Sequence, residues 1–193
     1  MWQMNPKKPP TEAYIWMDKV FTDDELDLII NIGKGLPQKD GSVNNTGATT
    51  PDVRRSKISW IKPEIHTEFI FRKLSNAINK LNSTYFDYAL TSREDLQFSE
   101  YDASYEGMYR NHTDDGFEAD GRKLSFSLQL SDPNDYDGGD LLMYRFKLNN
   151  PHVVKRERGF LAAFNSSTIH EVTPVTRGTR YSLVGWVHGP RFR

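Results

Sequence analysis

The sequence of 193 residues contains no cysteine. A disulfide framework and a thiolate metal site are therefore both excluded. No apolar run reaches the about 18 residues that a membrane-spanning helix needs, and no secretory hydrophobic region is present. The 25 basic and 26 acidic residues nearly balance, so the net charge gives no general attraction to nucleic acids or anionic membranes. We therefore expect a soluble cytoplasmic protein with no nucleic-acid and no membrane partner.

The composition is that of a folded domain. Hydrophobic residues make up 37% of the chain and aromatic residues 12%, which indicates a globular rather than a disordered protein. A chain of this length fits one domain with a sizeable core. Residues 1–12, which include the run Lys7-Lys8-Pro9-Pro10, are typical of a flexible tail. We predict a single domain over residues 13–193, preceded by this tail.

Two short segments contain a candidate metal site. His112 and Asp114 stand two residues apart, and His170 follows 58 residues after His112. Side chains two apart on a β-strand point to the same face, so His112 and Asp114 could share one ion, with His170 supplied by a facing strand. Two imidazoles and one carboxylate leave three octahedral positions open, which suits a ferrous ion that binds a co-substrate and dioxygen. The alternative is a surface histidine beside a carboxylate, with no metal.

A candidate anion clamp follows His170. Arg180 comes ten residues later and is followed by Ser182. Residues 173–178 are typical of a turn between two strands, which would bring Arg180 back beside His170. The guanidinium offers a planar fork of donors to a carboxylate, and strand alternation places Ser182 on the same face. These residues predict a clamp for a dicarboxylate beside the metal.

The surroundings of these residues resemble one known family. They are similar to the Fe(II)/2-oxoglutarate-dependent dioxygenases, and within them to the prolyl 4-hydroxylase-like branch. The similar stretches are Tyr101 to Asp114, with its tyrosines, glycine and His-x-Asp triplet, then Asp137 to Leu141, and Arg180 to Trp186. Collagen-type members carry lysine where this chain has Arg180. The arginine therefore favours the oxygen-sensing type, and a procollagen-proline type stays open.

The resemblance implies a fold, cofactors and a site. The fold is an α+β double-stranded β-helix, a jelly-roll or cupin-like barrel, with N-terminal helices packed on one sheet. The cofactors are Fe(II), 2-oxoglutarate and O2, and ascorbate is compatible with them. The implied site residues are His112, Asp114 and His170 for the metal, Arg180, Ser182, Tyr101 and Gln129 for 2-oxoglutarate, and Tyr109, Trp186, Arg122, Arg54 and Arg55 for the substrate.

The resemblance also implies a reaction, in which 2-oxoglutarate is decarboxylated to succinate while a prolyl residue of a peptide or protein is hydroxylated. Two alternatives stay open, a hydroxylase of a free amino acid or other small molecule and a non-catalytic metal-bearing binding module. Nucleic-acid demethylation is disfavoured, because basic and aromatic residues suited to base stacking are sparse. Trp186 could instead be a core aromatic, and His188 could line the pocket without being a ligand.

The pattern along the chain predicts helices first and strands later. Residues 22–35 begin with a capping box and residues 63–81 carry an apolar stripe at helical spacing. The alternation over 123–131 predicts a strand with an apolar face toward the helices and a polar face toward the pocket. Residues 35–52, rich in glycine, asparagine and threonine, are predicted to form a lid. The segment 54–60 either meets the substrate or is an edge strand with solvated cations.

Overall fold

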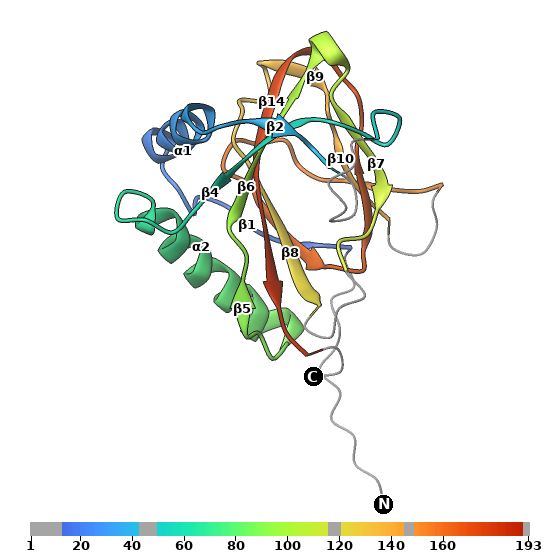
Figure 1. Ribbon diagram of the computed structural model, residues 1–193. Coiled ribbons are helices and arrows are strands. Elements are labelled where there is room, and N and C mark those ends of the chain that lie inside the picture. The colour runs from blue at the N-terminus through green and yellow to red at the C-terminus, as the bar shows by residue number, and fades with distance from the viewer. Residues whose placement is uncertain (1–12, 43–49, 116–120, 145–148, 191–193) are drawn as a thin grey trace, which may run out of the picture.

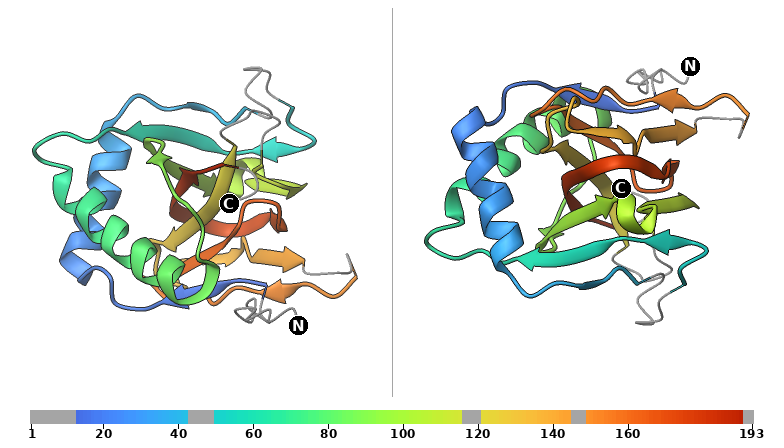
Figure 2. Two further views of the ribbon diagram at one scale, coloured as in Figure 1. Left: turned by 90° about the horizontal axis from the view of Figure 1, so that it is seen from below. Right: turned by 90° about the horizontal axis from the view of Figure 1, so that it is seen from above.

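The computed structural model describes residues 13–42, 50–115, 121–144 and 149–190. The predicted tail, residues 1–12, lies outside this part of the chain. Two antiparallel sheets face each other, and two helices cover the outer face of the larger sheet (Figures 1 and 2). This confirms the predicted double-stranded β-helix with helices on one sheet. Within the described ranges, no helix is long and apolar enough to cross a membrane.

The described residues form a nine-stranded and a five-stranded sheet. The larger sheet has the order β1 (Ile15–Met17), β12 (Leu161–Asn165), β8 (Arg122–Gln129), β14 (Val175–His188), β6 (Leu96–Asp102), β4 (Lys57–Ile61) and β2 (Lys39–Asp40), and β5 (Ser92–Arg93) and β9 (Tyr136–Gly138) also pair with β14. The smaller sheet has the order β11 (His152–Val153), β10 (Leu141–Tyr144), β13 (Ile169–Val172), β7 (Met108–His112) and β3 (Arg54–Arg55). A short 3-10 helix, η2 (Ala103–Tyr105), leads from β6 toward β7. The consecutive strands β13 and β14 therefore belong to different sheets.

Helix α1 (Asp23–Gly35) starts at the predicted capping box. The Thr22 hydroxyl accepts a hydrogen bond from the Glu25 N–H at 3.3 Å, and the Glu25 carboxylate accepts one from the Thr22 N–H at 2.8 Å. These two bonds satisfy amide donors that the first helical turn leaves free. Leu26 and Ile29 on the inner face are buried against the larger sheet. The predicted helix over 22–35 is confirmed.

Helix α2 (Glu68–Leu81) begins five residues later than predicted. The Thr67 hydroxyl donates to the Lys62 carbonyl at 2.6 Å and accepts from the Glu64 N–H at 2.9 Å. These bonds stabilise a turn where a first helical turn was expected, as threonine often does. Ile65, assigned to the apolar stripe, is 97% exposed. Phe69 is partly buried, and the rest of the stripe is buried. A π-helical turn, η1 (Asn82–Phe86), continues the helix.

Strand alternation separates an apolar core from the barrel interior. On β8, Leu124, Phe126 and Leu128 pack in one cluster with the buried faces of α1 and α2. Ser125 and Ser127 alternate with them and therefore face the other sheet. The same alternation continues on the neighbouring strand β14, where Leu183 belongs to the apolar cluster. The predicted packing of the apolar face on the helices is confirmed. On the polar face, Ser127 lines the cavity and Gln129 does not, and β8 runs from Arg122 to Gln129.

Gly33 lies where α1 crosses the larger sheet most closely. A Cβ at this position would stand 2.3 Å from the Phe98 ring. We expect Gly33→Ala to destabilise the protein, since overpacking costs about 1–3 kcal/mol whereas the gain in helix propensity is only about 1 kcal/mol. Urea unfolding measures the difference. Gly35→Ala in the same helix is the matched control, because nothing lies within 4 Å of its Cβ. Equal stability of the two variants would contradict the close packing.

Candidate metal centre and adjoining cavity

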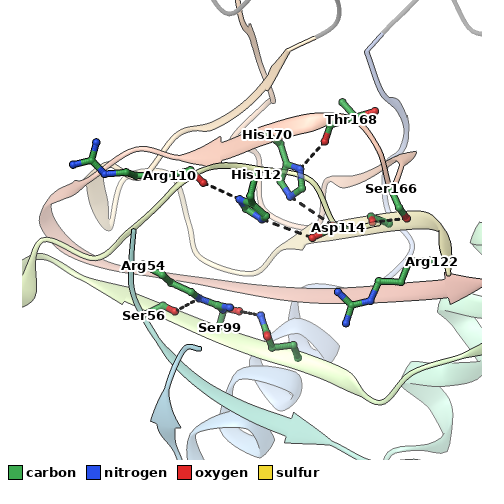
Figure 3. A network of polar contacts seen from close by, with 12 residues as sticks. Arg54, Ser56, Ser99, Arg110, His112, Asp114, Arg122, Ser166, Thr168 and His170 are labelled. Carbon is green, nitrogen blue, oxygen red and sulfur yellow. Dashed lines mark hydrogen bonds and ion pairs between the residues drawn. The ribbon is translucent and has the colours of Figure 1, made fainter. Parts of the chain in front are cut away.

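His112, Asp114 and His170 meet at the end of β7. His112 is the last residue of β7 and lies directly opposite His170 on the adjacent antiparallel strand β13. The third ligand therefore comes from a neighbouring strand of the same sheet, not from a facing one. Asp114 lies just beyond β7, and its N–H donates to the Ser166 carbonyl at 2.8 Å. Its approach to His112 is thus set by a loop contact, and the predicted strand alternation does not extend to it (Figure 3).

The three side chains present one donor atom each toward a common point. These atoms lie within 4.8 Å of one another. The Asp114 carboxylate oxygens lie 3.7 Å from His112 Nε2 and 3.6 Å from His170 Nε2. His112 Nδ1 is 2.8 Å from the Arg110 carbonyl, and His170 Nδ1 is 2.9 Å from the Thr168 carbonyl. Because a carbonyl can only accept, each Nδ1 carries the proton and each Nε2 lone pair is left free for a cation.

The electrostatics of His112 and Asp114 favour the protonation states of metal ligands. Burial, followed by the nearby His170, lowers the pKa of His112 to about 3, so its imidazole is neutral at ordinary pH. Burial opposes ionisation of Asp114, but His170 and His112 together with the Ser125 and Trp186 side chains lower the pKa of its carboxyl group. Among the described residues, the buried Asp114 Oδ2 has no hydrogen-bond partner. A buried carboxylate oxygen without a donor beside two imidazole lone pairs fits a divalent cation.

Arg180 lies across the cavity from the two histidines. Residues 173–174 connect β13 to β14, and β14 enters the larger sheet. The predicted turn would have placed Arg180 beside His170 in one sheet, whereas the two residues lie in different sheets. Arg180 is only 1% exposed. Its Nη2 donates to Gln129 Oε1 at 2.9 Å, its Nη1 is 3.5 Å from the Ser182 hydroxyl, and Tyr101 lies under the guanidinium at 5.4 Å.

The Arg180 guanidinium has no counter-ion within the described part of the chain. No carboxylate there lies within salt-bridge distance of Arg180, and its Nε lacks a hydrogen-bond partner. A buried unpaired cation is costly, so this position fits an anionic group from a ligand. Gln129 supports the guanidinium and does not line the cavity. A direct contact of Gln129 with 2-oxoglutarate stays a prediction.

A cavity of about 810 Å³ connects the metal site to Arg180. Its walls include residues from both sheets, as expected for the interior of a double-stranded β-helix. Among the predicted site residues, the following line it: His112, Asp114, His170, Arg180, Ser182, Tyr101, Tyr109, Trp186, Arg122 and Arg54. Arg55 does not. Its side chain contacts the Glu106 carbonyl and carboxylate and the Pro51 carbonyl.

A polar cluster at one wall includes a residue that sequence patterns did not single out. Glu94 accepts two hydrogen bonds from Arg122, at 2.6 and 2.7 Å, and contacts His188 Nε2 at 2.7 Å. Arg122 in turn lies 3.9 Å from the Trp186 ring. Glu94 thus fixes a cation–π pair that forms the wall. A single carboxylate ahead of β6 carries no sequence signal for this role, since its partners lie 28 and 94 residues away.

The segment predicted to be a lid is partly ordered by pairing. Lys39 and Asp40 form β2, which pairs with β4, and the Gly41 N–H donates to the Ser56 carbonyl at 2.8 Å. Residues 35–42 are therefore attached to the larger sheet, which is unlike a loop without structure of its own. Residues 43–49 lie outside the described residues. Lys39 and Ser42 line the cavity at this side.

Comparison with known proteins shows a similarity to one family over about half of the chain. Residues 96–188 match the model of the 2OG-Fe(II) oxygenase superfamily. A PKHD-type hydroxylase of Synechococcus sp. (strain JA-2-3B'a(2-13)) is 40% identical over 107 residues, which cover 52% of this chain and 47% of that protein. A PKHD-type hydroxylase of Maricaulis maris (strain MCS10) is 44% identical over 87 residues, covering 42% and 37%. The match thus spans about half the length of these curated relatives or less.

Solved structures share the fold. A Pseudomonas putida prolyl-4-hydroxylase superposes with a TM-score of 0.75 at 24% identity, covering 93% of this chain and 94% of that one. A prolyl hydroxylase from Trichoplax adhaerens, in complex with a peptide fragment of the hypoxia inducible factor oxygen degradation domain, gives a TM-score of 0.77 at 21% identity, covering 92% and 84%. Residues 96–188, which contain the three candidate metal ligands and Arg180, are thus similar to the 2OG-Fe(II) oxygenase superfamily. The similarity is to prolyl 4-hydroxylase-like proteins, and it implies Fe(II), 2-oxoglutarate and O2 as cofactors.

Proposed function

We propose that the protein is an Fe(II)- and 2-oxoglutarate-dependent hydroxylase that acts on a prolyl residue of a peptide or protein. One observation carries the proposal. A single cavity contains both a cation site and a buried arginine, and the described residues provide neither a hydrogen-bond donor for Asp114 Oδ2 nor a counter-ion for Arg180. A ferrous ion and a dicarboxylate would complement these two sites. The similarity of residues 96–188 to the 2OG-Fe(II) oxygenase superfamily supports the same two cofactors.

Each residue of the site has a role in this proposal. His112, Asp114 and His170 would hold the iron, and their backbone contacts fix the rings with Nε2 directed at it. Arg180 and Ser182 would bind the distal carboxylate of 2-oxoglutarate, with Tyr101 against the guanidinium. Iron and 2-oxoglutarate, when bound, supply the oxidising chemistry, while the protein positions and shields the reacting groups. Tyr109, Arg122 and Trp186 would form the walls against which the substrate residue packs.

A prolyl substrate is supported by the names of the relatives and of the structural neighbours. We expect a proline-containing peptide, incubated with the protein, Fe(II) and 2-oxoglutarate, to gain the mass of one oxygen atom, with succinate formed in equal amount. Peptide mass spectrometry and a succinate assay measure the two products. Free proline, assayed in parallel, tests the alternative of a free amino acid. Binding of metal and 2-oxoglutarate with no succinate formed under any condition would instead indicate a non-catalytic module.

A further inference from the structure

Arg54 is a second buried cation in the cavity. It lies on β3, in the smaller sheet, and is 8% exposed. Arg180 lies on β14 in the larger sheet, so the two guanidinium groups belong to different sheets. Both line the same cavity. A 2-oxoglutarate molecule with one carboxylate at the metal has one distal carboxylate left for an arginine. One of the two cations is therefore available to another anion.

Neutral groups hold the Arg54 side chain in place. Its Nε donates to the Ser56 hydroxyl at 2.8 Å and its Nη1 to the Ser42 carbonyl at 3.2 Å. The guanidinium lies over the Tyr109 ring at 4.6 Å (Figure 3 shows Arg54 and Ser56). The Cβ of a larger residue at Gly41 would stand 2.4 Å from Nε, so this glycine permits the close approach. These contacts orient the fork without neutralising its charge.

One hydrogen-bond donor of the oriented Arg54 guanidinium group is unused. Arg54 Nη2 is buried and has no hydrogen-bond partner among the described residues. In the same part of the chain, no carboxylate lies within salt-bridge distance of Arg54. A guanidinium that is desolvated, oriented and unpaired is costly unless a ligand supplies the anion. A carboxylate accepting from Nη1 and Nη2 together would match its geometry.

The position of Arg54 suits substrate better than co-substrate. Tyr109 lies between Arg54 and the metal site, with its ring 3.5 Å from that of His112 and 4.6 Å from the guanidinium. Lys39, which is exposed, lines the cavity on the same side as Ser42, the residue that holds Arg54. Arg180 is more deeply buried and has Ser182 beside it. The deeper cation fits 2-oxoglutarate, and the cation beside Tyr109 fits a group of the substrate.

We propose that Arg54 forms a carboxylate subsite, so that the preferred substrate carries a carboxylate close to the residue that is hydroxylated. This rests on the proposed hydroxylase function and narrows its substrate class. The carboxylate could be the side chain of an aspartate or glutamate flanking the target residue in a peptide. It could equally be the α-carboxylate of a C-terminal residue or free amino acid. In both cases Arg54 would bind the same chemical group, a carboxylate.

Matched ligands test the subsite by binding, independently of turnover. The first pair of probes is two short proline peptides that differ only in an aspartate or an asparagine beside the proline, and each side of the proline is tested in turn. The second pair is one neutral proline peptide prepared either as the free acid or as the C-terminal amide. Affinity is measured by calorimetry on the full chain loaded with Mn(II) and 2-oxoglutarate. We expect one carboxylate form to bind roughly 10- to 100-fold more tightly than its neutral twin, as for a hydrogen bond to a charged group. The favoured pair identifies the source of the carboxylate.

Variants of Arg54 assign the preference. Arg54→Gln should abolish the difference in affinity between the carboxylate and the neutral form of the favoured peptide pair. Arg54→Lys, which keeps the charge, should retain part of this difference. Arg72→Gln, an exposed arginine on α2, is the control for loss of one positive charge. Thermal unfolding shows whether each variant is folded. The proposal would be overturned if the wild-type protein bound the carboxylate and neutral peptides equally well. It would also be overturned if folded Arg54→Gln protein kept the preference for the carboxylate peptide.

Two further readouts separate this proposal from the proposed function. An Arg54→Gln variant that weakens 2-oxoglutarate binding instead of peptide discrimination would assign Arg54 to the co-substrate and refute the substrate subsite. Failure of the hydroxylase proposal has a different signature, which is the absence of succinate formation by the wild-type protein even with a bound peptide. If the wild-type protein formed no succinate but still bound the carboxylate peptide selectively, the carboxylate subsite at Arg54 would still be supported.

Discussion

His170→Ala is expected to abolish iron-dependent succinate formation while leaving the fold largely intact. Removing the imidazole leaves two of the three donor atoms that lie within 4.8 Å of one another. The Asp114 carboxylate would then have only His112 of the other two ligands beside it, with His112 Nε2 at 3.7 Å. A ferrous ion held by one imidazole and one carboxylate would be bound too weakly to orient a co-substrate. Equilibrium dialysis with Fe(II) under anaerobic conditions measures metal binding, and a succinate assay measures turnover.

A second histidine variant controls for non-specific effects. His66→Ala removes an imidazole that is 65% exposed, lies 3.6 Å from the Glu64 carboxylate and is far in sequence from the three ligands. It should bind iron and form succinate as the wild-type protein does. Thermal unfolding of both variants separates loss of metal from loss of structure. Undiminished turnover in folded His170→Ala would show that the metal is held elsewhere.

Arg180→Ala is expected to weaken 2-oxoglutarate binding sharply. The variant removes a buried, charge-assisted contact whose loss costs about 2–5 kcal/mol, or about 30-fold to a few thousand-fold in affinity. Because Ser182 would remain in the cavity wall, some binding through its hydroxyl group should persist. Arg180→Lys keeps the charge but not the planar fork, and we expect an intermediate affinity. Calorimetry on the Mn(II)-loaded protein gives the dissociation constants.

Arg177→Ala is the matched control on the same strand. Arg177 already donates to Asp137 at 2.6 Å and is exposed, so its loss should leave 2-oxoglutarate affinity unchanged. An unchanged affinity in Arg180→Ala together with a loss in Arg177→Ala would transfer the clamp to Arg177. Measuring peptide affinity alongside shows that the effect of Arg180 is confined to the co-substrate.

The chemistry of the site could be predicted from sequence because it depends on residue type and short spacing. His112, Asp114 and Arg180 were identified from local motifs, and the structure brings all three to one cavity. The alternation of β8 likewise indicated which side chains face the helices, because a period of two fixes the face of a strand from the sequence alone. The capping box at Thr22 set the start of α1 for the same reason, since its two hydrogen bonds span only three residues.

The pairing of strands could not be predicted in this way. Alternation gives the face of a strand but not its neighbour, so the turn after His170 gave no indication that β14 joins the other sheet. Glu94 escaped notice because its contacts with Arg122 and His188 are distant in sequence. The exposed Ile65 shows a further limit, because hydroxyl contacts of Thr67 outweighed an apolar spacing that favoured helix. Long-range contacts and local side-chain bonds decide these cases.

The long strand β14 carries two different sets of residues on its two sides. Arg180, Ser182 and Trp186 line the cavity, whereas Leu183 packs toward the helices. Inserting or deleting one residue within β14 ahead of Arg180 would exchange the two sides and turn the guanidinium into the apolar layer. A change of length within this strand is therefore expected to disrupt both the cavity and the packing on the helices. Substitution at alternate positions is less restricted, and it offers a route to altering ligand preference by protein engineering while the packing of the opposite side is kept.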